Sequence, residues 1–396
     1  MKIALFTTSF PSNSSTIVNA GVCVRDFAAV LTELGHEVEV LTPYKHGARH
    51  DFEHQRTTFF RWLGSEDSVA HIELQSPWGA LQLASIVLAG SVAALRLVRR
   101  FRPDHVLCFW VFPCGLWARI AGASTRTPFS LWALGSDIWA LGKLPGMPRV
   151  LRALASRATH RYADGLLLAQ DFARIAGLEV QFLATSRVLE PPKGVEQGSG
   201  GYFLYLGRYH TNKGIDLLIE ALGVVRQRLP RDFRLRAHGF GPLESKLHAR
   251  VAQLGLRDIV EINSPIEAHE MPIVLRRARG LIVPSRIESI PLVFSDALQM
   301  QVPLLVTDVG DMGELVRRHG GGVVCRPEIE DLGEALVGFV SKPPPGGSDV
   351  LRRYLDIRAS ARRFLASTQP EGAQPSKKAS LPPLLVGERG LMSDSC

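Results

Sequence analysis

An alternation of short apolar runs with amphipathic stretches constrains the fold of this chain most strongly. Lys2–Thr8 and Glu37–Leu41 have the composition of buried strands, and Gly21–Leu34 between them has the period of an amphipathic helix. The same alternation continues through 106–109, 115–121, 129–133, 165–168 and 171–176, and restarts at 202–206 and 215–227. Strands that alternate with helices in this way predict parallel sheets with helical crossovers.

A segment without any apolar period interrupts the alternation at residues 191–201, which are rich in proline and glycine. The 396 residues also exceed what one hydrophobic core usually serves. We therefore predict two Rossmann-like α/β domains that face each other across a cleft. The predicted boundaries are 1–185 for the first domain, 186–201 for the linker, 202–345 for the second domain, 346–368 for a partial closing helix and 369–396 for a disordered tail.

Charge and cysteine content narrow the class of protein. The net charge of +8 is spread along the chain, which suits anionic small substrates or an anionic membrane but provides no nucleic-acid platform. The five cysteines are scattered and lack a CxxC pair, so we expect a reducing, cytoplasmic location with neither disulfides nor a zinc site. The apolar stretch 80–95 is interrupted by polar residues, and we interpret it as a buried helix rather than a membrane span.

Two glycine turns in the second domain follow predicted strands. Gly207 and Arg208 end the strand at 202–206, and Lys213 stands just before the next helix. Cations at the carboxyl end of a strand could bind a pyrophosphate, although two solvated loop charges would have the same spacing. Gly239 and Gly241 form the second turn, which could bring a ligand close to backbone N–H groups or could only redirect the chain.

The segment 283–298 places Glu288 in a loop after a strand and Asp296 eight positions later, inside the following helix. A loop carboxylate there can accept hydrogen bonds from sugar hydroxyls, and one further along the helix can reach a ribose. Spacing alone equally allows a helix cap and a solvated helix residue.

The order of these motifs resembles glycosyltransferase family 4, whose members have the GT-B fold. The matching pieces in the second domain are Gly207-Arg208, Lys213-Gly214, Gly239-Phe240-Gly241-Pro242, Pro284-Ser285, Glu288, Asp296-Ala297, Val302-Pro303 and Thr307-Asp308-Val309-Gly310. In the first domain the pieces are Phe10-Pro11, Gly21, Gly35-His36-Glu37-Val38 and Leu134-Gly135-Ser136-Asp137. This resemblance covers about residues 1–180 and 202–342.

The resemblance implies that a sugar moves from a nucleoside diphosphate sugar to a glycan or lipid-linked acceptor, with retention and without a metal or other cofactor. Arg208 and Lys213 would neutralise the leaving diphosphate, and Glu288 would contact the donor sugar. The other donor-binding positions implied are Gly21, Gly207, Gly239, Gly241, Pro291, Leu292, Val293 and Asp296, with Asp296 on the ribose. Gly135, Ser136 and Asp137 are candidates on the acceptor side.

The chain departs from the family pattern at several points. Asp296 stands where the family usually has Glu, so we expect Asp296→Glu to be tolerated and to tighten donor binding. Leu134 replaces a common His, and the Pro-rich end of the chain predicts a closing helix that is short or absent.

Two other functions compete with transfer: a non-catalytic nucleotide-sugar-binding or assembly subunit, and a GT-B-fold epimerase or phosphorylase. The first domain carries five cations in the stretch 143–161, which could contact the inner face of an anionic membrane reversibly or could form a solvated face. The donor base, the sugar and the acceptor are not determined by these residues.

Overall fold

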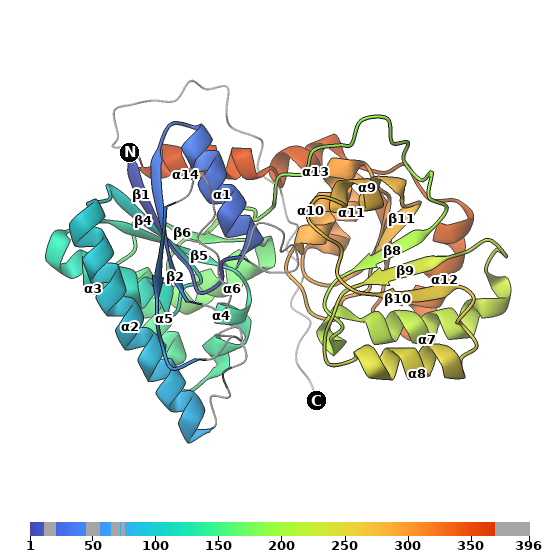
Figure 1. The fold of residues 1–396 in the computed structure, drawn as a ribbon, viewed down its shortest axis with the longest axis horizontal. Coiled ribbons are helices and arrows are strands. Elements are labelled where there is room, and N and C mark those ends of the chain that lie inside the picture. Colours follow the sequence, from blue (N-terminus) through green and yellow to red (C-terminus); the bar gives the residue numbers. More distant parts are fainter. Residues whose placement is uncertain (12–20, 45–55, 65–71, 73–75, 369–396) are drawn as a thin grey trace.

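The computed structural model describes residues 1–11, 21–44, 56–64, 72 and 76–368, which form two α/β domains lying side by side (Figure 1). Each domain has one parallel sheet covered by helices on both faces, as the alternation predicted. The predicted tail 369–396 lies outside the described residues.

The N-terminal domain contains a seven-stranded sheet whose order places the first strand in the middle. In spatial order its strands are β3 (Arg56–Phe60), β2 (Glu37–Pro43), β1 (Lys2–Phe6), β4 (His105–Phe109), β5 (Phe129–Ala133), β6 (Arg161–Ala163) and β7 (Gln181–Phe182). One face packs on α2 (Pro77–Phe101), α3 (Cys114–Thr125), α5 (Met147–Ala155) and α6 (Leu166–Ala176). The other face packs on α1 (Val22–Glu33) and on α14 (Ile357–Thr368). The strand order reverses between β1 and β4.

The C-terminal domain repeats this plan with six strands. Their spatial order is β10 (Val260–Asn263), β9 (Leu235–His238), β8 (Phe203–Leu206), β11 (Gly280–Val283), β12 (Leu304–Thr307) and β13 (Gly322–Cys325). The helices on one face are α7 (Ile215–Val225), α8 (Glu244–Gln253) and α12 (Ile329–Ser341). Those on the other are α9 (Met271–Arg277), α10 (Leu292–Met300), α11 (Met312–His319) and α13 (Asp349–Tyr354). Here the order reverses between β8 and β11.

The end of the described chain returns to the N-terminal domain, so the closing helix that was expected to be short or absent is present within residues 346–368. Helix α14 has 12 residues and lies beside α1 (Figure 1). The Phe364 ring packs edge-to-face on Phe27, with ring centroids 6.0 Å apart. The Ser360 hydroxyl also donates a hydrogen bond of 2.8 Å to the Ala184 carbonyl. The chain therefore crosses between the domains twice, once at the linker and once before α14. Burial of the apolar face of α14 against the N-terminal domain helps to hold the two domains together.

Helix α2 corrects the interpretation of 80–95 as a buried helix. Helix α2 has 25 residues and is long and apolar enough to cross a membrane, judged by length and composition alone. A core helix of a soluble protein can have the same length and composition. Only 33% of the most apolar stretch of α2 is buried. Its inner face packs on α3 at Gly90, where an added Cβ would lie 2.3 Å from the Trp117 ring. The outer face leaves the Leu88 side chain 67% exposed.

The segment 165–168 was expected to be a strand and is instead the start of α6, which follows the three-residue strand β6. An apolar run of this length fits either a buried strand or a buried helix. No side chain on α6's own N-terminal turn caps the helix.

Candidate functional site

The expected diphosphate-binding cations, Arg208 and Lys213, follow the carboxyl end of β8, and Glu288 follows that of β11, where the strand order of the C-terminal sheet reverses. Doubly wound sheets bind ligands at this point because the loops of the two neighbouring strands diverge there. Lys213, at the end of the short helix η3 (Thr211–Lys213), donates to the Glu288 carboxylate. The two side chains are 30% and 14% exposed, and the Arg208 side chain is exposed nearby on the same loop. The structure therefore brings Arg208, Lys213 and Glu288 to one edge of the sheet.

Two glycines with positive φ hold the loop that carries Glu288. At Gly214 (φ +69°) an added Cβ would lie 1.8 Å from the Pro284 carbonyl oxygen, and at Gly310 (φ +56°) it would lie 2.2 Å from the Glu288 carbonyl oxygen. Only glycine accepts both the backbone conformation and the contact. The Arg286 guanidinium fastens the loop from outside by donating to Asp216 Oδ1 at 2.8 Å. The loop is thus clamped between two turns, which fixes the Glu288 backbone.

The glycine turns that we expected to admit a ligand pack mainly on each other. An added Cβ on Gly239 would meet the Gly207 carbonyl oxygen at 1.9 Å, and one on Gly241 would meet the Tyr209 carbonyl oxygen at 2.5 Å. Their lack of a side chain is required by the contact between the two loops. Pro291, Leu292 and Val293 form the first turn of α10, with Pro291 as its N-cap.

The ribose-binding role expected for Asp296 disagrees with the structure. Asp296 is fully buried, and its carboxylate pairs with the guanidinium of Arg187, whose Nε lies 2.9 Å from Oδ1. The linker brings Arg187 there, and the neighbouring Val188 N–H donates to Asp26 Oδ2 of α1 at 3.0 Å. A longer carboxylate would have to displace the guanidinium in a closed space. The expected tolerance of Asp296→Glu is therefore corrected: we expect this variant to be destabilised.

On the acceptor side, Asp137 supports the backbone and does not face the cleft. It is fully buried and accepts hydrogen bonds from the N–H groups of Val111 at 2.7 Å and Leu134 at 3.2 Å. Burial raises the pKa of Asp137 to about 6, although these hydrogen bonds act to lower it. Asp137 thus ties the turn after β4 to the turn after β5. Gly135 (φ +102°) and Ser136 open the short helix α4 (Ser136–Trp139) that Asp137 anchors.

Gly21 caps α1 and packs closely against the turn after β1. An added Cβ would lie 2.6 Å from the Phe10 Cα. Residues 12–20 between them lie outside the described residues. The structure therefore explains why position 21 is glycine by a backbone contact, and its donor-phosphate role stays a prediction.

Sequence reasoning missed a group of polar residues where the two domains touch next to Glu288. Asp164 follows β6 and Asp311 follows β12, and both carboxylates are buried. The Ser289 hydroxyl donates to Asp164 Oδ1 at 3.0 Å. Asp311 accepts from the N–H groups of Leu166 at 2.7 Å and Leu167 at 3.1 Å. Asp164 and Asp311 each follow a strand, and this position could have marked them as candidate site residues. Their partners lie in the other domain, and the spacing of residues along the chain does not show such contacts.

The Asp164 carboxyl predicts a pH dependence of stability. Burial raises its pKa to about 8; the Ser289 hydrogen bond opposes this, while the charges of Asp137, Glu288 and Asp311 add to it. The folded form therefore holds a proton that the unfolded chain has released above its ordinary pKa of 3.8. This stabilising contribution is complete below about pH 4 and is lost as the pH rises to about 8. We expect Asp164→Asn, which stays neutral, to gain thermal stability over wild type progressively across this window. Equal differences in melting temperature at pH 5 and pH 8 would contradict the shift.

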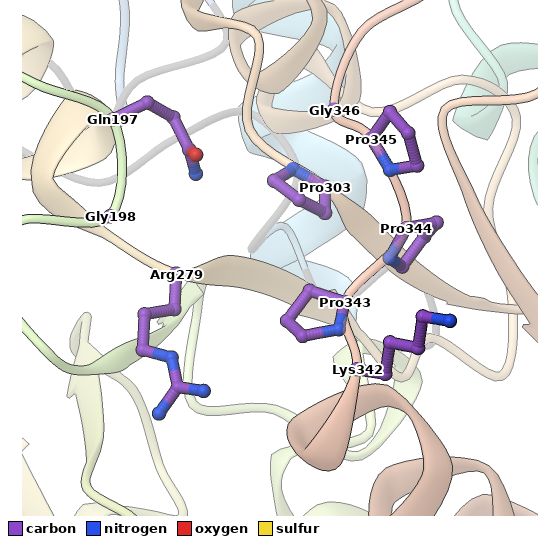
Figure 2. A pocket seen from close by; sticks show the side chains of 9 residues that line it. All are labelled: Gln197, Gly198, Arg279, Pro303, Lys342, Pro343, Pro344, Pro345 and Gly346. Atoms are coloured by element: carbon purple, nitrogen blue, oxygen red, sulfur yellow. The ribbon is translucent and has the colours of Figure 1, made fainter.

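One hollow lies away from this edge, at the amino ends of β11 and β12. It has a volume of about 630 Å³ and is lined by Arg279, Lys342 and the three prolines 343–345, among others. Figure 2 shows that its polar side chains, Gln197, Arg279 and Lys342, do not converge on one point. Within the described residues, no group of three or more His, Cys, Asp or Glu side chains has the arrangement of a metal site.

Comparison with known proteins gives consistent similarities. Residues 20–188 match the glycosyl transferase 4-like domain, and residues 189–354 match glycosyl transferases group 1. The chain is 30% identical to alpha-D-kanosaminyltransferase of Streptomyces kanamyceticus over 138 residues, 34% of this chain and 36% of that protein. It is 23% identical to the putative teichuronic acid biosynthesis glycosyltransferase TuaC of Bacillus subtilis over 265 residues, 64% of this chain and 65% of that protein. The chain thus spans little more than a third of the length of several curated relatives that it matches.

Solved structures resemble the whole described fold. Sucrose-phosphate synthase from Thermosynechococcus elongatus aligns with a TM-score of 0.67 at 15% identity, covering 93% of this chain and 96% of that chain. Anabaena HepE in complex with UDP and glucose aligns with a TM-score of 0.63 at 16% identity, covering 93% and 95%. At these identities the likeness concerns the fold, and the fold is GT-B.

Proposed function

We propose that this chain, which belongs to the family 4-like glycosyltransferases of the GT-B fold, transfers a sugar from a nucleoside diphosphate sugar to a glycan or lipid-linked acceptor. The observation that carries the proposal is the contact of Lys213 with Glu288 where the C-terminal strand order reverses, with Arg208 exposed on the same loop as Lys213. Two cations match a diphosphate, and a carboxylate beside them can accept hydrogen bonds from sugar hydroxyls.

The contact between Lys213 and Glu288 suggests how the donor would be accommodated. Without a donor the ammonium and the carboxylate neutralise each other. A diphosphate would draw Lys213 toward its oxygens and free Glu288 for the sugar. Arg208 and Lys213 would then stabilise the negative charge that grows on the leaving diphosphate as the glycosidic bond breaks. We extend the proposal to transfer without a metal ion, because these cations could neutralise the leaving diphosphate. We also extend it to transfer with retention, which the family resemblance implies.

The proposal is tested first with UDP-sugars, because UDP is the nucleotide named in the HepE complex. Thermal unfolding is measured with UDP, GDP and ADP, since a ligand that binds the folded state raises the apparent stability. Sugar transfer is then measured with and without EDTA. A nucleotide that binds without transfer or hydrolysis of its sugar would favour the non-catalytic subunit, and binding of none would refute both functions.

Arg208→Ala and Lys213→Ala are each expected to weaken binding of the matching nucleoside diphosphate by roughly 1.5–3 kcal/mol. The reason is the loss of one charged hydrogen bond to phosphate, so the affinity for the free nucleoside should stay nearly the same. Isothermal titration with both ligands separates these effects. Arg226→Ala is the matched control, because Arg226 pairs with Asp258 on the surface of the same domain. An unchanged dissociation constant for the diphosphate would remove the residue from the site.

We further propose that the N-terminal domain docks reversibly on the anionic inner face of a membrane. The exposed apolar side chains of α2 form one stripe at helical spacing: Trp78, Leu81, Leu88 and Val92, between 48% and 67% exposed. No charged residue occurs on α2 before Arg96. The N-terminal domain also has a hollow of about 460 Å³, which is lined by Lys143, Arg149 and Arg152 among others. Arg161 does not belong to this cationic surface, because its guanidinium donates to the carbonyls of Ala155, Ala158 and Glu179.

Membrane docking predicts salt-sensitive binding to anionic vesicles. Each cation near the surface contributes about 1 kcal/mol, and salt screens that attraction. We expect Leu88→Ser/Val92→Ser to reduce co-sedimentation with phosphatidylcholine–phosphatidylglycerol vesicles at low salt. Val224→Ser is the control, since Val224 is 63% exposed on the other domain. Equal binding to neutral and anionic vesicles, or none to either, would contradict the membrane proposal and leave the transferase proposal standing.

A further inference from the structure

The N-terminal end of α6 lacks a cap from its own domain. Its N-cap position is Gly165, which has no side chain, and none of the helix's own side chains accepts from the first N–H groups. The first N–H groups of a helix need acceptors from elsewhere, and a carboxylate is favoured there by the helix dipole. Helix α6 lies on the side of the N-terminal domain that is next to the C-terminal domain (Figure 1).

The missing cap is supplied by Asp311 from the other domain. Its two carboxylate oxygens accept from the N–H groups of Leu166 and Leu167, the first two residues of α6, at 2.7 and 3.1 Å. Asp311 is itself the N-cap residue of α11, yet its side chain does not cap that helix. With 3% of its surface exposed, Asp311 is closed off from solvent. The Asp311 carboxylate thus caps a helix of the neighbouring domain and not the helix that begins at its own position.

A second contact beside the first closes the junction. The Ser289 hydroxyl donates to Asp164 Oδ1 at 3.0 Å. Between the two contacts lies Gly165, where an added Cβ would be 2.1 Å from Ser289 Oγ and 2.6 Å from Asp311 Oδ2. The domains therefore approach here to a distance that any side chain at position 165 would prevent.

The junction is continuous with the candidate catalytic loop. Ser289 directly follows Glu288, and Gly310, which directly precedes Asp311, packs against the Glu288 carbonyl oxygen. On the other side, Asp164 and Gly165 connect β6 to α6 in the domain expected to hold the acceptor. These residues thus connect the domain expected to hold the acceptor directly to the loop that carries Glu288.

We infer that Asp311 is a positioning residue, which caps α6 across the domain boundary and, together with the Ser289–Asp164 hydrogen bond, sets the acceptor domain against the loop that carries Glu288. This inference rests on the proposed function, but the junction is a physical contact that can be tested without turnover. The proposed donor contacts come mainly from the C-terminal domain, so the cap should affect transfer and leave nucleotide affinity in place.

The test compares Asp311→Ala with Asp308→Ala in the full chain. Asp308 lies in the same turn but pairs with Arg317 of its own domain, at 2.6 Å. We expect Asp311→Ala to lower the turnover number about 100-fold, since a small misplacement of reacting groups has effects of this size. The dissociation constant of the nucleoside diphosphate should change less than about twofold, because truncation removes no contact proposed to hold the donor. The control should retain turnover within about threefold, because the Asp308 pair lies inside one domain and does not reach α6.

Hydrogen exchange gives a readout that is independent of activity. The amides of Leu166 and Leu167 should exchange at least about tenfold faster in Asp311→Ala than in Asp308→Ala, because their acceptor is gone. Gly165→Ala should lower turnover similarly, and combining it with Asp311→Ala should add little, since both changes open one contact. Unchanged exchange at 166–167 would overturn the cap. Faster exchange with normal turnover would overturn the positioning role. If wild type transfers no sugar at all, the proposed function fails while the exchange result still decides the cap.

Discussion

Replacement of Glu288 by glutamine is expected to lower sugar transfer by about 100- to 1000-fold, the effect of removing one preorganised group that stabilises the transition state. Glutamine keeps the size of the side chain and the clamped backbone, so the protein should fold normally. It removes the negative charge that pairs with Lys213 and would accept hydrogen bonds from the donor sugar. The measurement is initial-rate transfer at saturating donor, with circular dichroism and thermal unfolding on the same preparation.

Glu334→Gln is the matched control for this change. Glu334 also pairs with a basic residue, Arg228, but on the exposed surface of α12, so its loss should leave transfer unchanged. Glu288→Ala should behave like Glu288→Gln. Normal turnover by either folded Glu288 variant would remove this carboxylate from the reaction and leave the assignment of Arg208 and Lys213 to be decided by titration.

Replacement of Arg187 by alanine is expected to destabilise the chain by about 3–5 kcal/mol, the usual result of leaving one partner of a buried ion pair uncompensated. Asp296 would then keep a fully buried carboxylate without its guanidinium. In the native chain burial lowers the pKa of Arg187, but the Asp296 carboxylate more than offsets this and the pKa is raised. Urea unfolding measures the loss as a lower midpoint.

Two further variants separate the charge from the packing. A double replacement, Arg187→Met with Asp296→Leu, removes both charges together and should recover most of the stability, because well-packed apolar side chains can replace a buried pair. Arg228→Ala breaks only an exposed pair and should leave the midpoint nearly unchanged. If Arg187→Ala unfolds at the wild-type midpoint, the pair does not stabilise the junction between linker and α10.

Much of the architecture followed from local patterns. Buried strands and amphipathic helices differ in the period of their apolar residues, and this period depends on neighbours in sequence only. This period was enough to predict the parallel sheets, the two domains and a break near residue 190. The two family matches also meet near that residue. The motifs around Arg208, Lys213 and Glu288 could be placed at strand ends for the same reason, and the family resemblance supplied roles that spacing alone left open.

Where local pattern was ambiguous, partners distant in sequence decided the outcome. The run at 165–168 became the start of a helix whose cap is Asp311, 146 positions away from Gly165 in the chain and in the other domain. Helix α14 forms despite the Pro-rich residues after it, because Phe364 and its neighbours find an apolar face beside Phe27. Helix α2 is only partly covered, since its outer face leaves one apolar stripe exposed in the part of the chain that the structure describes.

The sequence by itself determined the repeating αβ units, their division into two domains and the strand ends that carry the candidate donor-binding residues, because these depend on local periodicity and on short motifs. Only the tertiary structure decided that Asp296 is held by Arg187, that Asp137 ties two turns together and that Asp164, Ser289 and Asp311 join the domains. A carboxylate's role depends on which donor reaches it in space. That partner is set by how the sheets, helices and linker pack, and no spacing along the chain contains it.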